Sequence, residues 1–135
     1  LKDVPALTMS KLPEGAEPSY GFMRLLYNKD MMTCDKETFC KAVAAEGINC
    51  NVRYAATPYT AEWYTKRRVF GNSGYPWAAP EYKGDRSKVY SLADLPNASK
   101  ALDDTIIIYP VETWTDENIA QCANAFRKVY EAYKK

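Results

Sequence analysis

The sequence predicts an α+β fold, in which a small, mostly antiparallel sheet of three to four strands has helices packed on one face. Short runs of aliphatic and aromatic residues alternate with segments of helical periodicity, which is the first observation behind this prediction. The second is size, because 135 residues suffice for one domain with a buried core. The third is composition: 47% hydrophobic and 26% charged residues are typical of a globular chain.

Residues 1–19 contain three prolines and no clear period, so we expect an extended lead-in segment there and a single domain over residues 20–135. The first strand is predicted over residues 20–27, where apolar residues end at a polar turn. Asp35 then caps a predicted helix that continues to about Glu46, with Phe39, Cys40 and Val43 on one face. Gly47 follows as a left-handed stop.

A short strand is predicted over residues 48–54, because apolar and polar side chains alternate there. The apolar set is Ile48, Cys50 and Val52, and the polar set is Asn49, Asn51 and Arg53. If the apolar set faces the core, Arg53 faces away from it. The strand therefore ends on an outward arginine followed directly by Tyr54.

Residues 57–90 form a long segment without a clear period, apart from a short helix expected around residues 61–70. This segment holds eight of the chain's 18 aromatic residues. Structureless segments of such length inside a compact domain are usually functional or cover another surface. We therefore expect an exposed apolar patch here, and self-association through it.

Regular structure is predicted again near the C-terminus, with a brief helix over residues 97–103 and a strand over residues 105–109. Thr115 caps the last helix, and Asp116 and Glu117 lie in its first turn, where the helix dipole favours acids. The predicted apolar stripe of this helix consists of Ile119, Cys122, Ala123, Phe126, Val129, Tyr130 and Tyr133.

Composition excludes several classes of function. The chain has no histidine, which removes Ser-His-Asp and Cys-His nucleophiles and most catalytic zinc sites. A net charge of +1 gives no general attraction to nucleic acid, and no apolar run reaches the roughly 20 residues of a membrane span. The four cysteines form no C-x-x-C pair, so we expect reduced, buried thiols and a cytoplasmic location.

Two charged clusters have both a chemical and a structural interpretation. Lys66, Arg67 and Arg68 lie between aromatic residues and could contact phosphates, but a solvated helix face explains them equally simply. Glu112, Asp116 and Glu117 could act as acid and base or bind a metal, although helix capping accounts for the last two. We favour the structural interpretation in both cases and expect no metal site.

The candidate binding residues are Arg53, Tyr54 and Tyr59. An arginine guanidinium grips carboxylate or phosphate through two parallel hydrogen bonds. Tyrosine adds a hydroxyl group on a rigid apolar ring. This combination suits a small, polar, anionic ligand.

Two groups of motifs resemble the C-terminal domain of the DegT/StrS family. The first is the segment 39–48, which ends Ala-Glu-Gly-Ile, followed by Arg53-Tyr54 and by Pro58-Tyr59. The second is the segment 95–102 beginning Leu-Pro-Asn-Ala, the strand ending at Pro110, and Thr115-Asp-Glu-Asn-Ile119. Together these motifs extend over most of residues 20–133, in the family's order and spacing. Arg53 stands where the family often has histidine or an aromatic residue.

The resemblance implies a parent enzyme that depends on pyridoxal phosphate, an aminotransferase or dehydratase acting on nucleotide-linked sugars or aminocyclitols. It implies the small domain of a fold-type-I enzyme, a large N-terminal domain as partner, a homodimer and a small-molecule sugar substrate. The family's Schiff-base lysine motif is not found among the 12 lysines of this chain. We therefore expect the chain alone to bind no cofactor and to hold no catalytic residue, as the C-terminal part of a larger protein. The alternative is a stand-alone, non-enzymatic binding module derived from the same fold.

Overall fold

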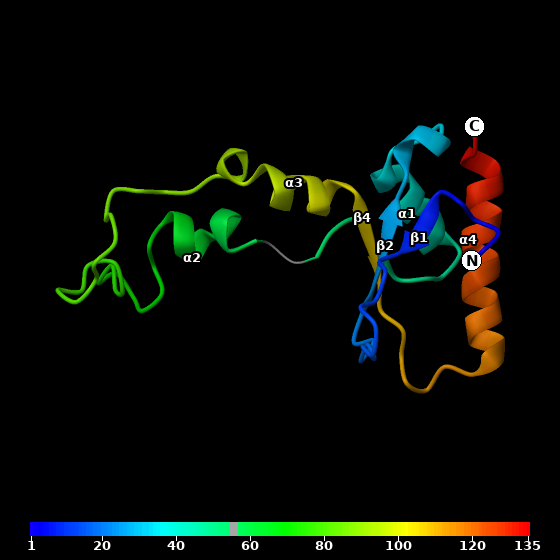
Figure 1. Cartoon of the computed structure of the whole chain (residues 1–135), viewed down its shortest axis with the longest axis horizontal. Helices are drawn as coiled ribbons and strands as arrows, with labels where there is room; N and C mark the ends of the chain where they lie inside the picture. Colours follow the sequence, from blue (N-terminus) through cyan, green and yellow to red (C-terminus); the bar gives the residue numbers. More distant parts are fainter. Residues whose placement is uncertain (55–56) are drawn as a thin grey trace. The chain divides into compact units, whose positions relative to one another are not determined.

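In the computed structural model, which describes residues 1–54 and 57–135, the chain forms two compact units (Figure 1). Unit 1 comprises residues 1–54 and 102–135, and the described part of unit 2 comprises residues 57–101. Unit 1 is an α+β domain with a four-stranded antiparallel sheet, which confirms the predicted fold class. Unit 1 also includes residues 1–19 of the expected lead-in segment, and the single domain expected over residues 20–135 stays a prediction.

The sheet of unit 1 has the strand order β1-β2-β4-β3. Its strands are β1 (Leu7–Met9), β2 (Met23–Tyr27), β3 (Cys50–Asn51) and β4 (Thr105–Ile108). β1 pairs with β2 from Leu7 opposite Tyr27 to Met9 opposite Leu25, so the lead-in supplies an edge strand. Val4, Ala6 and Leu7 are buried, which means that this segment is part of the domain core.

Two helices pack on one face of the sheet, α1 (Lys36–Ala45) and α4 (Asp116–Tyr133) (Figure 1). The predicted cap of α1 is confirmed, because an Asp35 carboxylate oxygen accepts from the Thr38 backbone N–H at 2.8 Å. Gly47 follows the helix with a φ of 89°, a left-handed conformation that glycine adopts without strain. Thr115 caps α4, its hydroxyl oxygen accepting from the Asn118 N–H at 3.3 Å.

The core lies between the sheet and these helices. Because side chains alternate along the strands, one face of the sheet presents four side chains to α1 and α4, and all four are buried. They are Leu25, Tyr27, Ile106 and Ile108. Phe39 and Phe126 are fully buried between the helices and the sheet, with ring centroids 6.2 Å apart. The Tyr27 hydroxyl donates to the Cys34 carbonyl at 2.8 Å, so the buried tyrosine keeps a polar partner.

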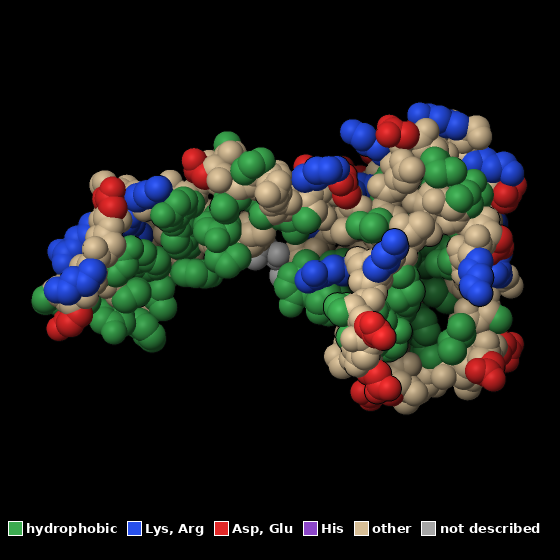
Figure 2. Space-filling view, viewed as in Figure 1, with side chains coloured by type: hydrophobic (Ala, Val, Ile, Leu, Met, Phe, Trp, Pro, Cys, Tyr) green, Lys and Arg blue, Asp and Glu red, His purple; other side chains and the backbone are tan. Residues whose placement is uncertain are grey.

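The apolar stripe of α4 differs from the prediction at its first position. Cys122, Phe126 and Val129 are buried as expected, but Ile119 is 54% exposed. Ile119 instead lines an open apolar hollow of about 400 Å³ beside α4, together with Trp114. Figure 2 shows hydrophobic side chains around this hollow. The first turn of α4 therefore extends beyond the edge of the sheet's core.

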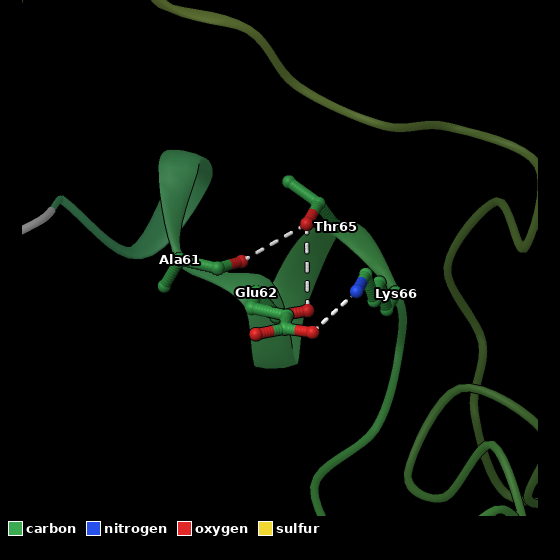
Figure 3. Close-up of polar contacts among 4 residues, drawn as sticks. All are labelled: Ala61, Glu62, Thr65 and Lys66. Carbon is green, nitrogen blue, oxygen red and sulfur yellow. Dashed lines mark hydrogen bonds and ion pairs between the residues drawn. The ribbon is translucent and has the colours of Figure 1, made fainter.

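Unit 2 contains short helical segments, among them α2 (Glu62–Thr65), and it includes most of α3 (Pro96–Asp103). α2 is shorter than the helix expected over residues 61–70, because Arg67 adopts a left-handed backbone conformation with φ 52°. Within α2, the Thr65 hydroxyl donates to the Ala61 carbonyl at 3.2 Å, and Lys66 pairs with Glu62 (Figure 3). None of the helices in the described residues is long and apolar enough to cross a membrane.

Large apolar side chains are exposed in unit 2, as expected for residues 57–90. They include Trp63, Val69, Phe70, Tyr75, Val89 and Tyr90. Figure 2 shows hydrophobic side chains gathered over α2 and the loop that follows it. Self-association through this surface stays a prediction.

Candidate anion-binding site on the outer face of the sheet

The outer face of the sheet, which points away from α1 and α4, is set by the strand register. Arg24 of β2 pairs with Ile107 of β4, and Ile107 pairs with Asn51 of β3. Their neighbours Leu25 and Ile106 face the helical core, so this row faces the other way. Arg24 is exposed there, whereas Ile107 is buried.

An aromatic cluster surrounds Arg24 at one end of this row. Its guanidinium carbon lies 5.2 Å from the centroid of the Phe22 ring and 5.9 Å from that of the Tyr54 ring. The two rings are 5.0 Å apart, and Tyr109 adds a third ring 6.3 Å from Phe22. Cations at these distances are attracted by the ring quadrupole, so the aromatic rings restrict where the guanidinium lies.

The charge of Arg24 is available to a ligand. The side-chain ion pairs of the described residues connect other groups, such as Arg127 with Asp3 and Lys128 with Glu46. Neither Arg24 nor Arg53 takes part in any of them. An exposed guanidinium already ordered by aromatic rings retains its hydrogen-bond donors for an anion.

Arg53 is exposed, as the strand alternation predicts, and its charge acts on Lys36. Burial lowers the pKa of Lys36, the negative charge of Asp103 opposes this, and the positive charge of Arg53 adds to the lowering. The Lys36 ammonium donates to the Leu102 carbonyl at 2.6 Å and to the Thr105 carbonyl at 3.5 Å. Lys36 therefore ties the start of α1 to the chain that enters β4.

The predicted binding residues are divided between the two units. Arg53 and Tyr54 belong to unit 1, where Tyr54 contacts Arg24. Tyr59 belongs to unit 2, and its ring neighbours there are Tyr64 and Tyr90.

Arg24 is the residue that sequence reasoning missed. One signal could have found it: in the segment Phe22-Met-Arg24-Leu25, period-2 alternation places the arginine and the phenylalanine together on the face opposite Leu25.

The basic cluster Lys66-Arg67-Arg68 is largely engaged in internal contacts. Lys66 pairs with Glu62, and the Arg67 guanidinium donates to the backbone carbonyls of Arg86 and Lys88. Arg67 also lies over the Trp77 ring, 5.9 Å from its centroid. These contacts favour a structural role for two of the three charges.

The acidic candidates at the start of α4 are exposed, and Asp116 and Glu117 occupy its first turn as expected of helix-stabilising acids. In the part of the chain that the structure describes, no group of histidine, cysteine, aspartate or glutamate is arranged to hold a metal ion.

The four cysteines are all unpaired thiols, namely Cys34, Cys40, Cys50 and Cys122. The Cys50 thiol donates to the Cys40 sulfur at 3.3 Å, and that hydrogen bond, with burial, raises the pKa of Cys50.

The residues of this chain do not fit the Schiff-base role of a cofactor lysine. A lysine needs a desolvated or electrostatically strained amine to act as a nucleophile, and Lys36 comes nearest to this because its pKa is lowered. Its nitrogen, however, is held by two backbone carbonyls, which favour the charged ammonium. We derive no chemical step through pyridoxal phosphate from these residues.

Comparison with known proteins assigns no family, since no family model and no curated protein sequence matches the chain.

Proposed function

We propose that this chain is the C-terminal, substrate-binding domain of a pyridoxal-phosphate-dependent aminotransferase or dehydratase that acts on nucleotide-linked sugars or aminocyclitols. One observation carries the proposal: Arg24 lies over Phe22 and Tyr54 on the outer face, with no ion-pair partner among the described residues. Nucleotide-linked sugars carry a diphosphate, and phosphate oxygens are the acceptors that a guanidinium binds best.

Each residue of the proposed site has its own role in ligand binding. Arg24 binds a phosphate group, while Phe22 and Tyr54 hold its guanidinium in place. Arg53 supplies a second positive charge next to Tyr54 in the chain. The Tyr54 hydroxyl adds a donor for a phosphate or sugar oxygen. The ligand is a small anionic molecule, in agreement with the type of ligand predicted from Arg53 and Tyr54.

The motifs support the identity of the parent enzyme. α1 ends at Ala45, directly before Glu46-Gly47-Ile48, and α4 begins after Thr115. The DegT/StrS resemblance places a helix end and a helix start at these two points. In this proposal the large N-terminal domain carries the cofactor, which supplies the carbanion-stabilising chemistry when bound. This chain binds and shapes the sugar substrate within a cytoplasmic homodimer and performs no catalysis alone.

Calorimetric titration of the full 135-residue chain with uridine diphosphate tests the anion site. Arg24→Ala is expected to weaken binding about tenfold or more, since it removes charge-assisted hydrogen bonds. Lys29→Ala is the matched control, because it removes one exposed positive charge of unit 1 outside the outer face. Equal losses in both variants, or no binding by the unaltered chain, would contradict the proposed site.

Incubation with pyridoxal phosphate and borohydride, followed by mass spectrometry, tests the expected inactivity of the chain alone. A stoichiometric reduced adduct on one lysine would contradict it.

The alternative, a stand-alone binding module that uses Lys66-Arg67-Arg68, is less favoured because Lys66 and Arg67 are engaged internally. Salt-sensitive binding of a polyanion that is lost on Arg68→Glu, and kept on Arg24→Ala, would support that alternative.

A further inference from the structure

Unit 2 contains a second site that the proposed function does not use. Rings of Tyr59, Tyr64, Trp77 and Tyr90 line a pocket of about 270 Å³, which we call the aromatic pocket. Tyr82, Gly84, Asp85 and Lys88 complete its lining. We propose that the aromatic pocket binds a single neutral sugar ring.

The angles between the rings argue against a flat aromatic ligand. The planes of Tyr59 and Tyr64 meet at 87°, those of Tyr59 and Tyr90 at 69°, and those of Tyr64 and Trp77 at 70°. Sandwiching a nucleobase requires two nearly parallel faces, whereas these faces enclose a box. A sugar ring presents C–H groups on its faces and hydroxyls around its edge, so it can contact several rings that meet at steep angles.

The charges in the aromatic pocket argue against an ionic ligand. The Lys88 ammonium lies 4.6 Å from the centroid of the Tyr90 ring, so the cation position over that ring is already taken. Asp85 brings a carboxylate into the same lining, which repels anions. The Lys88 ammonium is a donor and the Asp85 carboxylate is an acceptor. Together they suit the hydroxyl groups of a neutral ligand, because a hydroxyl both donates and accepts.

The acceptor is held in position by its own neighbours. Asp85 Oδ1 accepts from the Ser87 backbone N–H at 2.8 Å and from the Ser87 hydroxyl at 2.6 Å. These hydrogen bonds lower the pKa of Asp85, which keeps the carboxylate ionised at neutral pH. The Tyr64 hydroxyl accepts from the Tyr90 backbone N–H at 3.4 Å, so two residues of the lining are also hydrogen-bonded to each other.

The pocket size fits one ring. A volume of about 270 Å³ lies just below the range of small-molecule pockets, which begins at about 300 Å³. Glycine at position 84 keeps the wall intact, because a Cβ there would come within 2.6 Å of the Tyr82 hydroxyl oxygen. Gly84→Ala must therefore displace the Tyr82 side chain from the lining.

The experiment is a nuclear magnetic resonance titration of the full chain with methyl β-glucopyranoside as probe. Binding with shifts confined to residues of the aromatic pocket is expected. Gly84→Ala, Asp85→Asn and Tyr90→Ala are each expected to weaken it about tenfold or more. Phe70→Ala is the matched control, since Phe70 is an exposed aromatic residue of unit 2 outside the pocket, and it should bind like the unaltered chain.

Two further probes test whether the aromatic pocket prefers another class of ligand. Uridine and tetramethylammonium test a nucleobase and an organic cation, and tighter binding of either one overturns the proposal. Absence of any shift with the glucoside in the unaltered chain overturns it too, as does unchanged affinity in Gly84→Ala and Asp85→Asn. The pocket shares no residue with the outer face, so loss of uridine diphosphate binding in Arg24→Ala bears on the proposed function alone.

Discussion

The guanidinium of Arg24 lies over the ring of Tyr54, with the guanidinium carbon 5.9 Å from the ring centroid. Arg24 comes from a central strand and Tyr54 from the chain beyond β3, so the contact joins segments 30 residues apart in sequence. Tyr54, which the sequence predicts to contact a ligand, thus lies against an arginine that the sequence does not single out.

The first prediction concerns this pair. In a double-mutant cycle with Arg24→Ala and Tyr54→Ala, we expect a coupling free energy of unfolding of about 0.5–1 kcal/mol, as for exposed cation–π pairs. Urea denaturation of the four proteins measures it. A second cycle, with Lys29→Ala and Tyr54→Ala, serves as the control, and no coupling is expected in it. A coupling near zero in both cycles would show that the contact contributes nothing to stability.

The second prediction concerns the two phenylalanines of the core. Phe39 and Phe126 are fully buried, so Phe39→Ala or Phe126→Ala removes apolar contacts and leaves a cavity. The expected loss is about 3–5 kcal/mol in the free energy of unfolding, measured by urea denaturation. Phe70→Ala, at a position 66% exposed, should change it by less than about 0.5 kcal/mol. Similar losses at all three positions would contradict the described core.

Local signals explain which elements could be predicted. α1 and α4 each have a capping residue and an apolar stripe, so the sequence contains their beginnings and their buried faces. β1 has only three residues and no such signal, because its stability comes from pairing with β2. Sequence pattern marks neither the pairing partner nor the depth of burial of Val4.

For the candidate sites too, local sequence signals mark single residues but not the contacts between distant segments. Arg53 and Tyr54 could be singled out because they end the alternating strand predicted over residues 48–54, although β3 itself ends at Asn51. The cation that contacts Tyr54 is Arg24 from β2. That contact depends on which strands are neighbours in the sheet. The aromatic pocket of unit 2 was also missed: residues 57–90 show an excess of aromatic residues, but the way their rings meet has no period in sequence.

The third prediction is a pH dependence at the cap of α1. Hydrogen bonds from Thr38 lower the pKa of Asp35, so this group binds a proton more weakly in the folded state. Its contribution to stability is therefore present above the unfolded pKa of about 3.9 and lost as the pH falls through the lower folded value.

Asp35→Ala should accordingly lower the thermal midpoint at pH 7, and the difference from the unaltered chain should shrink below about pH 4. Asp35→Ser is the control, since serine caps without ionising and should show a smaller loss with no such pH dependence. Circular dichroism melts between pH 3 and pH 7 give the comparison. A difference for Asp35→Ala that is constant over this range would contradict the assigned role.

The last prediction concerns the thiols. Cys40, Cys50 and Cys122 are buried, while Cys34 is partly exposed. Burial raises the pKa of Cys122, and the hydrogen bond to Cys40 together with burial raises that of Cys50, so both groups stay protonated near neutral pH. The hydrogen bond from Cys50 lowers the pKa of Cys40, but its thiol is buried and shielded from a reagent in solution. An alkylating reagent at pH 8 should therefore modify Cys34 first in the folded chain, as peptide mapping by mass spectrometry would show. In denaturant all four should react at similar rates, and Cys34→Ser should remove the early phase. Modification of Cys50 as fast as Cys34 in the folded chain would mean that the Cys50 thiol is not buried as described.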